Sequence, residues 1–149
     1  WDLLFFFIYL FIAIYAMEQA GVLELIGKGI EPIIGMGDIF GGGLLLVSSA
    51  VASSVTDNIP LAAVLANILN SMNIANDSGM WWSVIFGANL GGNLTPIGSA
   101  STLVAVTIMH KHDLKISFMG FVKKALPFAI LHIILATAYV LFVLKHLPG

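Results

Sequence analysis

The sequence SSVTDNIP, at residues 53–60, decides the fold because it interrupts a long apolar region. One apolar stretch, residues 44–55, leads into it, and a second, residues 61–69, follows it. Each stretch falls short of the roughly 20 residues that a membrane-spanning helix needs, and apolar runs of about 10–14 residues are more often buried or re-entrant. The sequence therefore predicts a helical hairpin that enters and leaves a membrane on one side, with residues 53–60 as its tip.

The composition indicates a membrane protein. Of the 149 residues, 59% are hydrophobic and 9% are charged, and the mean hydropathy is +1.01. An ordinary soluble domain is about 45–50% apolar and about a quarter charged. The absence of cysteine excludes disulfides, thiolate metal sites and a cysteine nucleophile. A net charge of -2 without a basic run argues against nucleic-acid binding.

A second interruption, GGNLTPIGS at residues 91–99, divides the apolar region at residues 80–110. The region is long enough to cross a membrane, and the break lies in its middle, where Gly and Pro disturb a helix most. We expect a discontinuous transmembrane helix, with glycines that permit close backbone approach and positive φ. The alternative is a Gly-Pro kink packed against a neighbouring helix.

The remaining segments predict the topology. Residues 3–17 form an apolar run, and residues 18–38 are interpreted as a helix end and an interfacial connector, after which the glycines at 41–43 open the first hairpin arm. Residues 110–124 carry most of the lysines and precede a spanning helix at 125–144. By the positive-inside rule the 110–124 loop is cytoplasmic, so the hairpin enters from the outer side and the C-terminus lies outside.

Helix breaks at membrane depth need partners. An unpaired backbone group in hydrocarbon costs several kcal/mol, and transporters satisfy such groups with substrate or ions. Pro60 suits the start of the second arm, with Asn58 or Ile59 as its cap, and that helix end attracts anions. A buried Asp57 would need a cation or proton to compensate its charge. The alternative is an ordinary surface loop in which Asp57 is solvated.

The polar side chains and glycines of the two interruptions form the candidate substrate and ion site. They are Ser53, Ser54, Thr56, Asp57, Asn58, Asn89, Gly91, Gly92, Asn93, Thr95, Gly98 and Ser99, with Ser101 and Thr102 close by in sequence. Asn58, Asn93 and Thr95 are the candidate Na⁺ ligands among them. No cofactor is expected.

Together the two interruptions resemble the second repeat of the ion transporter superfamily, in its citrate-transporter-like, arsenite-efflux and pink-eyed-dilution-type branches. The segment EQAGVLE, at residues 18–24, is similar to the segment that precedes the hairpin in these proteins. The fold class expected is an all-helical membrane protein. The resemblance implies an inverted-repeat fold in which residues 1–149 are a single transporter domain, the C-terminal half of a larger permease. One difference is that the dicarboxylate branch has a Ser-Asn-Thr tip, whereas this chain has Thr56-Asp57-Asn58.

The function implied by the resemblance is secondary active transport of a small anion, citrate-like or arsenite-like, coupled to Na⁺ or H⁺. The alternative within the superfamily is Na⁺/H⁺ antiport. The implied location is the plasma (inner) membrane, where the chain would cross several times. The implied partners are the lipid bilayer, the transported ion, the N-terminal repeat of the same protein and a second copy in a homodimer.

Other readings of the sequence are weaker. The GMGD sequence at residues 35–38 has the spacing of membrane aspartyl proteases, but a carboxylate dyad needs a second embedded Asp, so no enzyme is expected. Re-entrant hairpins also build channels, although a channel would not require a second broken helix. His132 is interpreted as a packed, hydrogen-bonded residue that faces the bundle, with a proton relay as the alternative.

Overall fold

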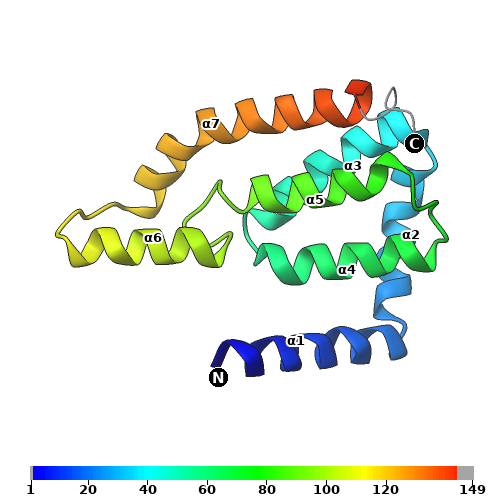
Figure 1. Cartoon of the computed structure of the whole chain (residues 1–149), viewed down its shortest axis with the longest axis horizontal. Coiled ribbons are helices and arrows are strands. Elements are labelled where there is room, and N and C mark those ends of the chain that lie inside the picture. The colour runs from blue at the N-terminus through cyan, green and yellow to red at the C-terminus, as the bar shows by residue number, and fades with distance from the viewer. Residues whose placement is uncertain (1, 144–149) are drawn as a thin grey trace.

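The computed structural model describes residues 2–143, and all regular secondary structure in that range is helical. Helices α1, α3, α4, α5, α6 and α7 lie with their axes in similar directions, and α2 crosses near one end of the group (Figure 1). The elements are α1 (Asp2–Gln19), α2 (Val22–Ile34), α3 (Gly37–Ser53), α4 (Asn58–Ser71), α5 (Gly79–Gly91), α6 (Ala100–Lys111), α7 (Phe118–Ala138) and the short π-helix η1 (Tyr139–Val143). The prediction of an all-helical chain is confirmed.

The hairpin formed by α3 and α4 packs on α5 through a shared apolar core. Leu45 of α3 contacts a cluster made with Leu65 and Leu69 of α4 and with Met80 and Val84 of α5. All five side chains are at most 7% exposed. This core fixes the hairpin against the first half of the broken helix, so the tip of one lies beside the interruption of the other (Figure 1).

Helices α3 and α5 approach so closely that glycine is required between them. A Cβ added to Gly91 would overlap the Ala50 carbonyl oxygen and lie 2.5 Å from Ala50 Cα. A Cβ added to Gly87 would lie 2.7 Å from Ser49 Cβ. Small residues four apart allow two helix backbones to touch, which is the packing typical of membrane helices.

Serine side chains begin three of the helices. The hydroxyls of Ser78, Ser99 and Ser117 accept hydrogen bonds from backbone amides two or three residues further on, at 3.1–3.3 Å, at the starts of α5, α6 and α7. Such caps satisfy amides that have no partner within the helix. The polar residues in the loops therefore determine where these helices start.

Within the described residues, one helical stretch, Phe118–Phe142, is long and apolar enough to cross a membrane. It has 25 residues and a mean hydropathy of 2.2. Helices α3 and α4 are apolar but shorter, with 17 and 14 residues. The two arms are therefore longer than the predicted stretches, residues 44–55 and 61–69, but each is still shorter than 18 residues.

The interpretation of residues 18–38 as a connector is wrong for the greater part, because α2 occupies 13 of them. Ile30, Ile33 and Ile34 of α2 pack on the hairpin core, and Glu24 and Lys28 form an exposed ion pair of 3.0 Å. A helix with one apolar face and one charged face is stable at a boundary between apolar and aqueous surroundings. The charges in this segment mark one face of a helix.

Two further boundaries differ from the prediction. The glycines at 41–43 lie inside α3, which begins at Gly37, because Gly41 packs against the Ile33 carbonyl of α2. Helix α7 begins at Phe118, where Ser117 caps it, so the connector before it is residues 112–117 and the lysines at 123 and 124 are helical. The predicted end of this helix, Leu144, lies outside the described residues.

Candidate functional site

The hairpin tip, residues 53–60, contains a short turn at residues 54–57 between α3 and α4. Asp57 caps α4, because its Oδ1 accepts a hydrogen bond from the Ile59 amide at 3.1 Å. The predicted cap at Asn58 or Ile59 is therefore wrong: a carboxylate one residue earlier already satisfies the amide, and Asp is a far better cap than Ile. Pro60 lies in the first turn of α4, as predicted.

The break between α5 and α6 spans residues 92–99, which confirms the predicted interruption. At its end, the hydroxyl of Ser99 lies 3.0 Å from the hydroxyls of both Ser101 and Thr102. Ser99 and Thr102 are buried, at 6% and 9% exposure. The start of α6 therefore carries a cluster of hydroxyls, two of them inside the protein.

Side chains join the tip to the break and to the end of α5 that precedes it. Ser53 Oγ donates to the Ala88 carbonyl oxygen at 2.5 Å, and Thr95 Oγ1 donates to the Ser54 carbonyl oxygen at 2.5 Å. The amide of Asn58 donates to Asn89 Oδ1 at 3.3 Å. Residues more than 30 positions apart in the sequence thus meet at one place, as the candidate site requires.

Backbone contact accounts for the glycines of the break. A Cβ on Gly98 would lie 3.0 Å from the Ser53 carbonyl oxygen and 2.9 Å from the Gly92 carbonyl oxygen. The prediction of close approach is confirmed, whereas positive φ at these glycines is wrong. Among the described glycines, positive φ occurs at Gly21 and Gly37. Close packing leaves no space for a side chain, and the backbone itself keeps ordinary angles.

Three of the predicted residues lie at the open side of this contact. Thr56 and Asn93 are exposed, and each donates to a carbonyl four residues earlier, at 2.9 Å and 3.4 Å respectively. Asp57 is partly exposed, and its carboxylate accepts the hydrogen bond from the Ile59 amide of α4. The interior of the site is therefore made by Ser53, Thr95 and Ser99, and the exposed polar groups lie at its rim.

Sequence reasoning did not find the carbonyl acceptors of the contact. Ala88 and Ala50 take part only through their backbones, and alanine carries no chemical signal. The spacing of Gly87 and Gly91, four residues apart on α5, is the one sequence feature that pointed to a close helix partner.

Four helix ends meet at the site. The C-terminal ends of α3 and α5 and the N-terminal ends of α4 and α6 converge where the tip contacts the break (Figure 1). Helix C-termini present carbonyl oxygens and attract cations, whereas N-termini present amides and attract anions. The candidate site therefore brings together two helix ends of each polarity, with the polar side chains of Asn58 and Thr95 beside them.

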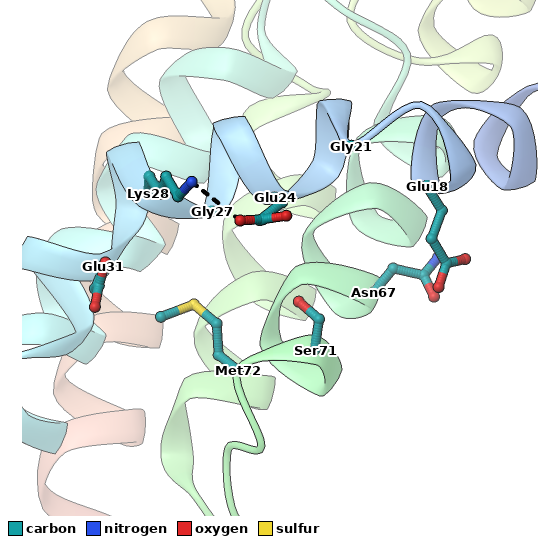
Figure 2. A pocket seen from close by; sticks show the side chains of 9 residues that line it. All are labelled: Glu18, Gly21, Glu24, Gly27, Lys28, Glu31, Asn67, Ser71 and Met72. Atoms are coloured by element: carbon teal, nitrogen blue, oxygen red, sulfur yellow. Dashed lines mark ion pairs between the residues drawn. The ribbon is translucent and has the colours of Figure 1, made fainter.

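A cavity of about 560 Å³ lies away from the candidate site, where α2 passes the C-terminal part of α4 (Figure 2). It is lined by Glu18, Gly21, Glu24, Gly27, Lys28, Glu31, Asn67, Ser71 and Met72. Its charged side chains are exposed, and one carboxylate is already paired with Lys28. We place the candidate site at the tip and break, because helix ends and buried hydroxyls converge there.

The Thr95 hydrogen bond can be tested by a volume-conserving change. Thr95→Val should lower the free energy of unfolding by about 1–3 kcal/mol, because it leaves the Ser54 carbonyl oxygen without its donor. Thr95→Ser should keep most of the stability. Denaturant unfolding of the purified protein in detergent measures both. Thr107→Val is the control, since Thr107 bonds only within exposed α6. Equal losses for Thr95→Val and Thr107→Val would contradict the link between tip and break.

Comparison with protein families gives a match to the citrate transporter model, CitMHS, over residues 1–85. This covers α1 to α4 and the first half of α5. The match includes the hairpin tip and ends before the break. It agrees with the resemblance to citrate-transporter-like proteins found in the sequence.

Several known proteins are similar to almost the whole chain. An uncharacterized transporter of Mycobacterium tuberculosis is 32% identical over 155 residues, covering 98% of this chain and 36% of the relative. An uncharacterized transporter of Synechocystis sp. is 30% identical, with 94% and 35% covered. The P protein of Homo sapiens is 30% identical, with 95% and 18% covered. The chain thus spans about a third of the bacterial relatives' length.

These similarities extend past residue 85 and therefore include the break. The bacterial relatives are named as transporters, which agrees with the expectation that the chain is not an enzyme. No solved structure matches the chain.

Proposed function

This chain belongs to the citrate transporter family, and from that premise we propose that it forms one half of a secondary active transporter for a small anion, citrate-like or arsenite-like, coupled to Na⁺ or H⁺. The family makes the chain a membrane protein. The observation that carries the proposal further is the contact of the hairpin tip with the break, where four helix ends meet.

The helix lengths support a re-entrant hairpin. Helices α3 and α4 are apolar and too short to span a bilayer with ease, and they join at a polar turn. An irregular backbone is tolerated at membrane depth only where protein or an aqueous cavity surrounds it. We therefore propose that α3 and α4 enter and leave on one side, and that α5 and α6 are the halves of one discontinuous transmembrane helix.

The charges at the site suit coupled transport. The N-terminal ends of α4 and α6 would hold the anion, because their amides and helix dipoles favour negative charge. Carbonyl oxygens at the ends of α3 and α5, with Asn58, Asn93 and Thr95, would hold Na⁺. Asp57 is the acid at the tip and would couple transport to the cation. Asn93 could bind Na⁺ only after its side-chain amide breaks the 3.4 Å hydrogen bond that it donates to the Asn89 carbonyl oxygen.

The exposed apolar surface fits a chain whose surroundings are lipid and further protein. Helix α6 projects from the others, and Leu103, Val104 and Ile108 on it are 52–56% exposed. We propose that lipid and the N-terminal repeat of the same transporter cover such surfaces, and that the repeats are inverted. The lysines near residues 111–124 would then face the cytoplasm, with the hairpin entering from outside, the C-terminus outside, and two copies forming a homodimer.

The alternative is Na⁺/H⁺ antiport, which the position of Asp57 favours. A carboxylate at the junction of two helix C-termini and two N-termini can bind Na⁺ or a proton in turn. In that case the helix N-termini would stabilise the carboxylate itself, because Asp57 already accepts a hydrogen bond from an amide of α4.

Flux measurements in liposomes test the proposal. The natural full-length protein is reconstituted, and labelled citrate and arsenite uptake is followed under an imposed Na⁺ or pH gradient. We expect uptake above the external concentration when the gradient is present, and equilibration alone when it is absent. Labelled Na⁺ movement driven by a pH gradient, without anion uptake, would select the antiporter. Flux that only runs downhill under every gradient would contradict transport and favour a channel.

A further inference from the structure

His132 lies near the middle of the one long apolar stretch of the described chain, Phe118–Phe142. His132 faces α5, as expected, but the expectation that it is packed and hydrogen-bonded is wrong. The side chain is exposed, and the described residues include no hydrogen-bond partner of its ring. An ionisable group in a membrane-spanning segment is costly, and such groups usually mark ion or proton pathways.

The imidazole shares a cavity with the break. A cavity of about 170 Å³ lies where α7 passes the end of α5, and its lining residues are Leu90, Asn93, Ala125, Phe128, Ala129 and His132. Asn93 and His132 are the two polar side chains among them. Asn93 belongs to the unwound segment and holds the Asn89 carbonyl oxygen by a long contact of 3.4 Å. Its side chain can therefore change partner at little cost.

The surroundings of His132 contain few other titratable groups. Across two adjoining cavities His132 faces Phe86 and Leu90 of α5 and Asn93 of the break. Tyr139, the first residue of η1, lines the second cavity, of about 410 Å³. Neither cavity is lined by a described carboxylate or lysine. On α3, Gly43 lies near Thr137 and Leu141, and Leu46 packs with Ala136 and Val140, so these neighbours carry no titratable group. The lysines at 123 and 124 are exposed and about two turns away along α7.

We propose that His132 is a proton-binding site coupled to the unwound segment through Asn93. An imidazole takes up a proton readily in water and reluctantly in apolar surroundings. A conformation in which the cavity is hydrated therefore binds the proton better than one in which it is closed. Any ligand that binds two conformations unequally shifts the balance between them. Protonation of His132 would in this way favour one arrangement of the break.

The inference rests on the proposed transport function, since it names H⁺ as a coupling ion, but its test does not require transport. The chain has no cysteine, so one introduced thiol can report on the break. Ile97 lies in the unwound segment and is 55% exposed. The rate of alkylation of Ile97→Cys by N-ethylmaleimide is measured between about pH 5 and 8 in the natural full-length protein, freed of other cysteines.

The rate is compared with that in the same protein carrying His132→Gln. The ratio of the two rates cancels the ionisation of the thiol. We expect the ratio to change by about fivefold or more across this range, which is the lower end of ordinary coupling between sites. A ratio that differs from one but is equal at every pH would show a purely structural effect of the substitution and overturn the proposal.

Two controls sharpen the result. When His110→Gln replaces His132→Gln in the comparison, the ratio of rates should be independent of pH, because His110 is at the end of α6, where its Nε2 lies 3.3 Å from the Ile116 carbonyl oxygen. Asn93→Ala should abolish the pH-dependent part of the His132 effect, and its survival would overturn the coupling through Asn93. A pH-dependent ratio without any uphill flux would leave this inference standing and refute the proposed function, whereas uphill flux with a constant ratio would do the reverse.

Discussion

Replacing Gly91 by alanine should disrupt the contact between the hairpin and the broken helix and abolish transport. The added methyl group would overlap the Ala50 carbonyl oxygen and lie 2.5 Å from Ala50 Cα, so both obstacles are backbone atoms. A backbone cannot move aside as the end of a flexible side chain can, and α3 and α5 would have to separate. Overpacking of this kind costs about 1–3 kcal/mol and sometimes more.

The separation would also lengthen the two hydrogen bonds that hold tip and break together, from Ser53 to Ala88 and from Thr95 to Ser54. We therefore expect a loss of stability beyond the steric term alone. The unfolding midpoint in detergent and flux in liposomes measure the two effects separately. Loss of flux at unchanged stability would indicate that the helices part only locally, around the site.

Gly29→Ala is the matched control. Gly29 lies in α2, and a Cβ there would have no neighbour within 4 Å. Alanine favours a helix by up to about 1 kcal/mol over glycine, so this variant should be as stable as the natural protein or slightly more so. If Gly91→Ala behaved like Gly29→Ala, the close approach of α3 and α5 would not exist as described.

The two interruptions were predictable because they depend on local chemistry. Pro60 and Pro96 cannot continue a helix, and polar residues between apolar stretches satisfy the exposed amides. The hairpin, the break and the start of α6 at Ser99 followed from such signals. The contact between tip and break was predictable only through the resemblance, since nothing local relates Ser53 to Ala88.

The sequence predictions were wrong where packing between helices determines the local structure. Residues 22–34 carry charges and a proline, which suggested a connector. Their isoleucines pack on the hairpin core, and this packing stabilises the segment as helix α2. The glycines at 41–43 looked like a helix start, yet one of them is where α3 meets α2. Likewise, no periodicity in α7 shows that His132 shares a cavity with Asn93, because that depends on how α7 lies against α5.

The second large effect is expected at Asp57, whose two properties can be separated. Its carboxylate carries a charge at the site and also caps α4 by accepting the Ile59 amide. Asn caps a helix as well as Asp does, whereas Ala does not. Asp57→Asn therefore removes the charge and keeps the cap, and Asp57→Ala removes both.

For Asp57→Asn we expect stability within about 0.5 kcal/mol of the natural protein, as for a substitution that keeps its contacts. Stimulation of uptake by the coupling cation should fall by about 5- to 150-fold, the range of ordinary coupling energies. Asp57→Ala should show the same loss and, in addition, about 0.5–2 kcal/mol less stability. Flux at varied Na⁺ concentration and pH, together with unfolding in detergent, distinguishes the two. If Asp57→Asn kept the full cation dependence while Asp57→Ala lost stability, Asp57 would be a helix cap alone, and the cation would have to be held by the carbonyl and amide oxygens around it.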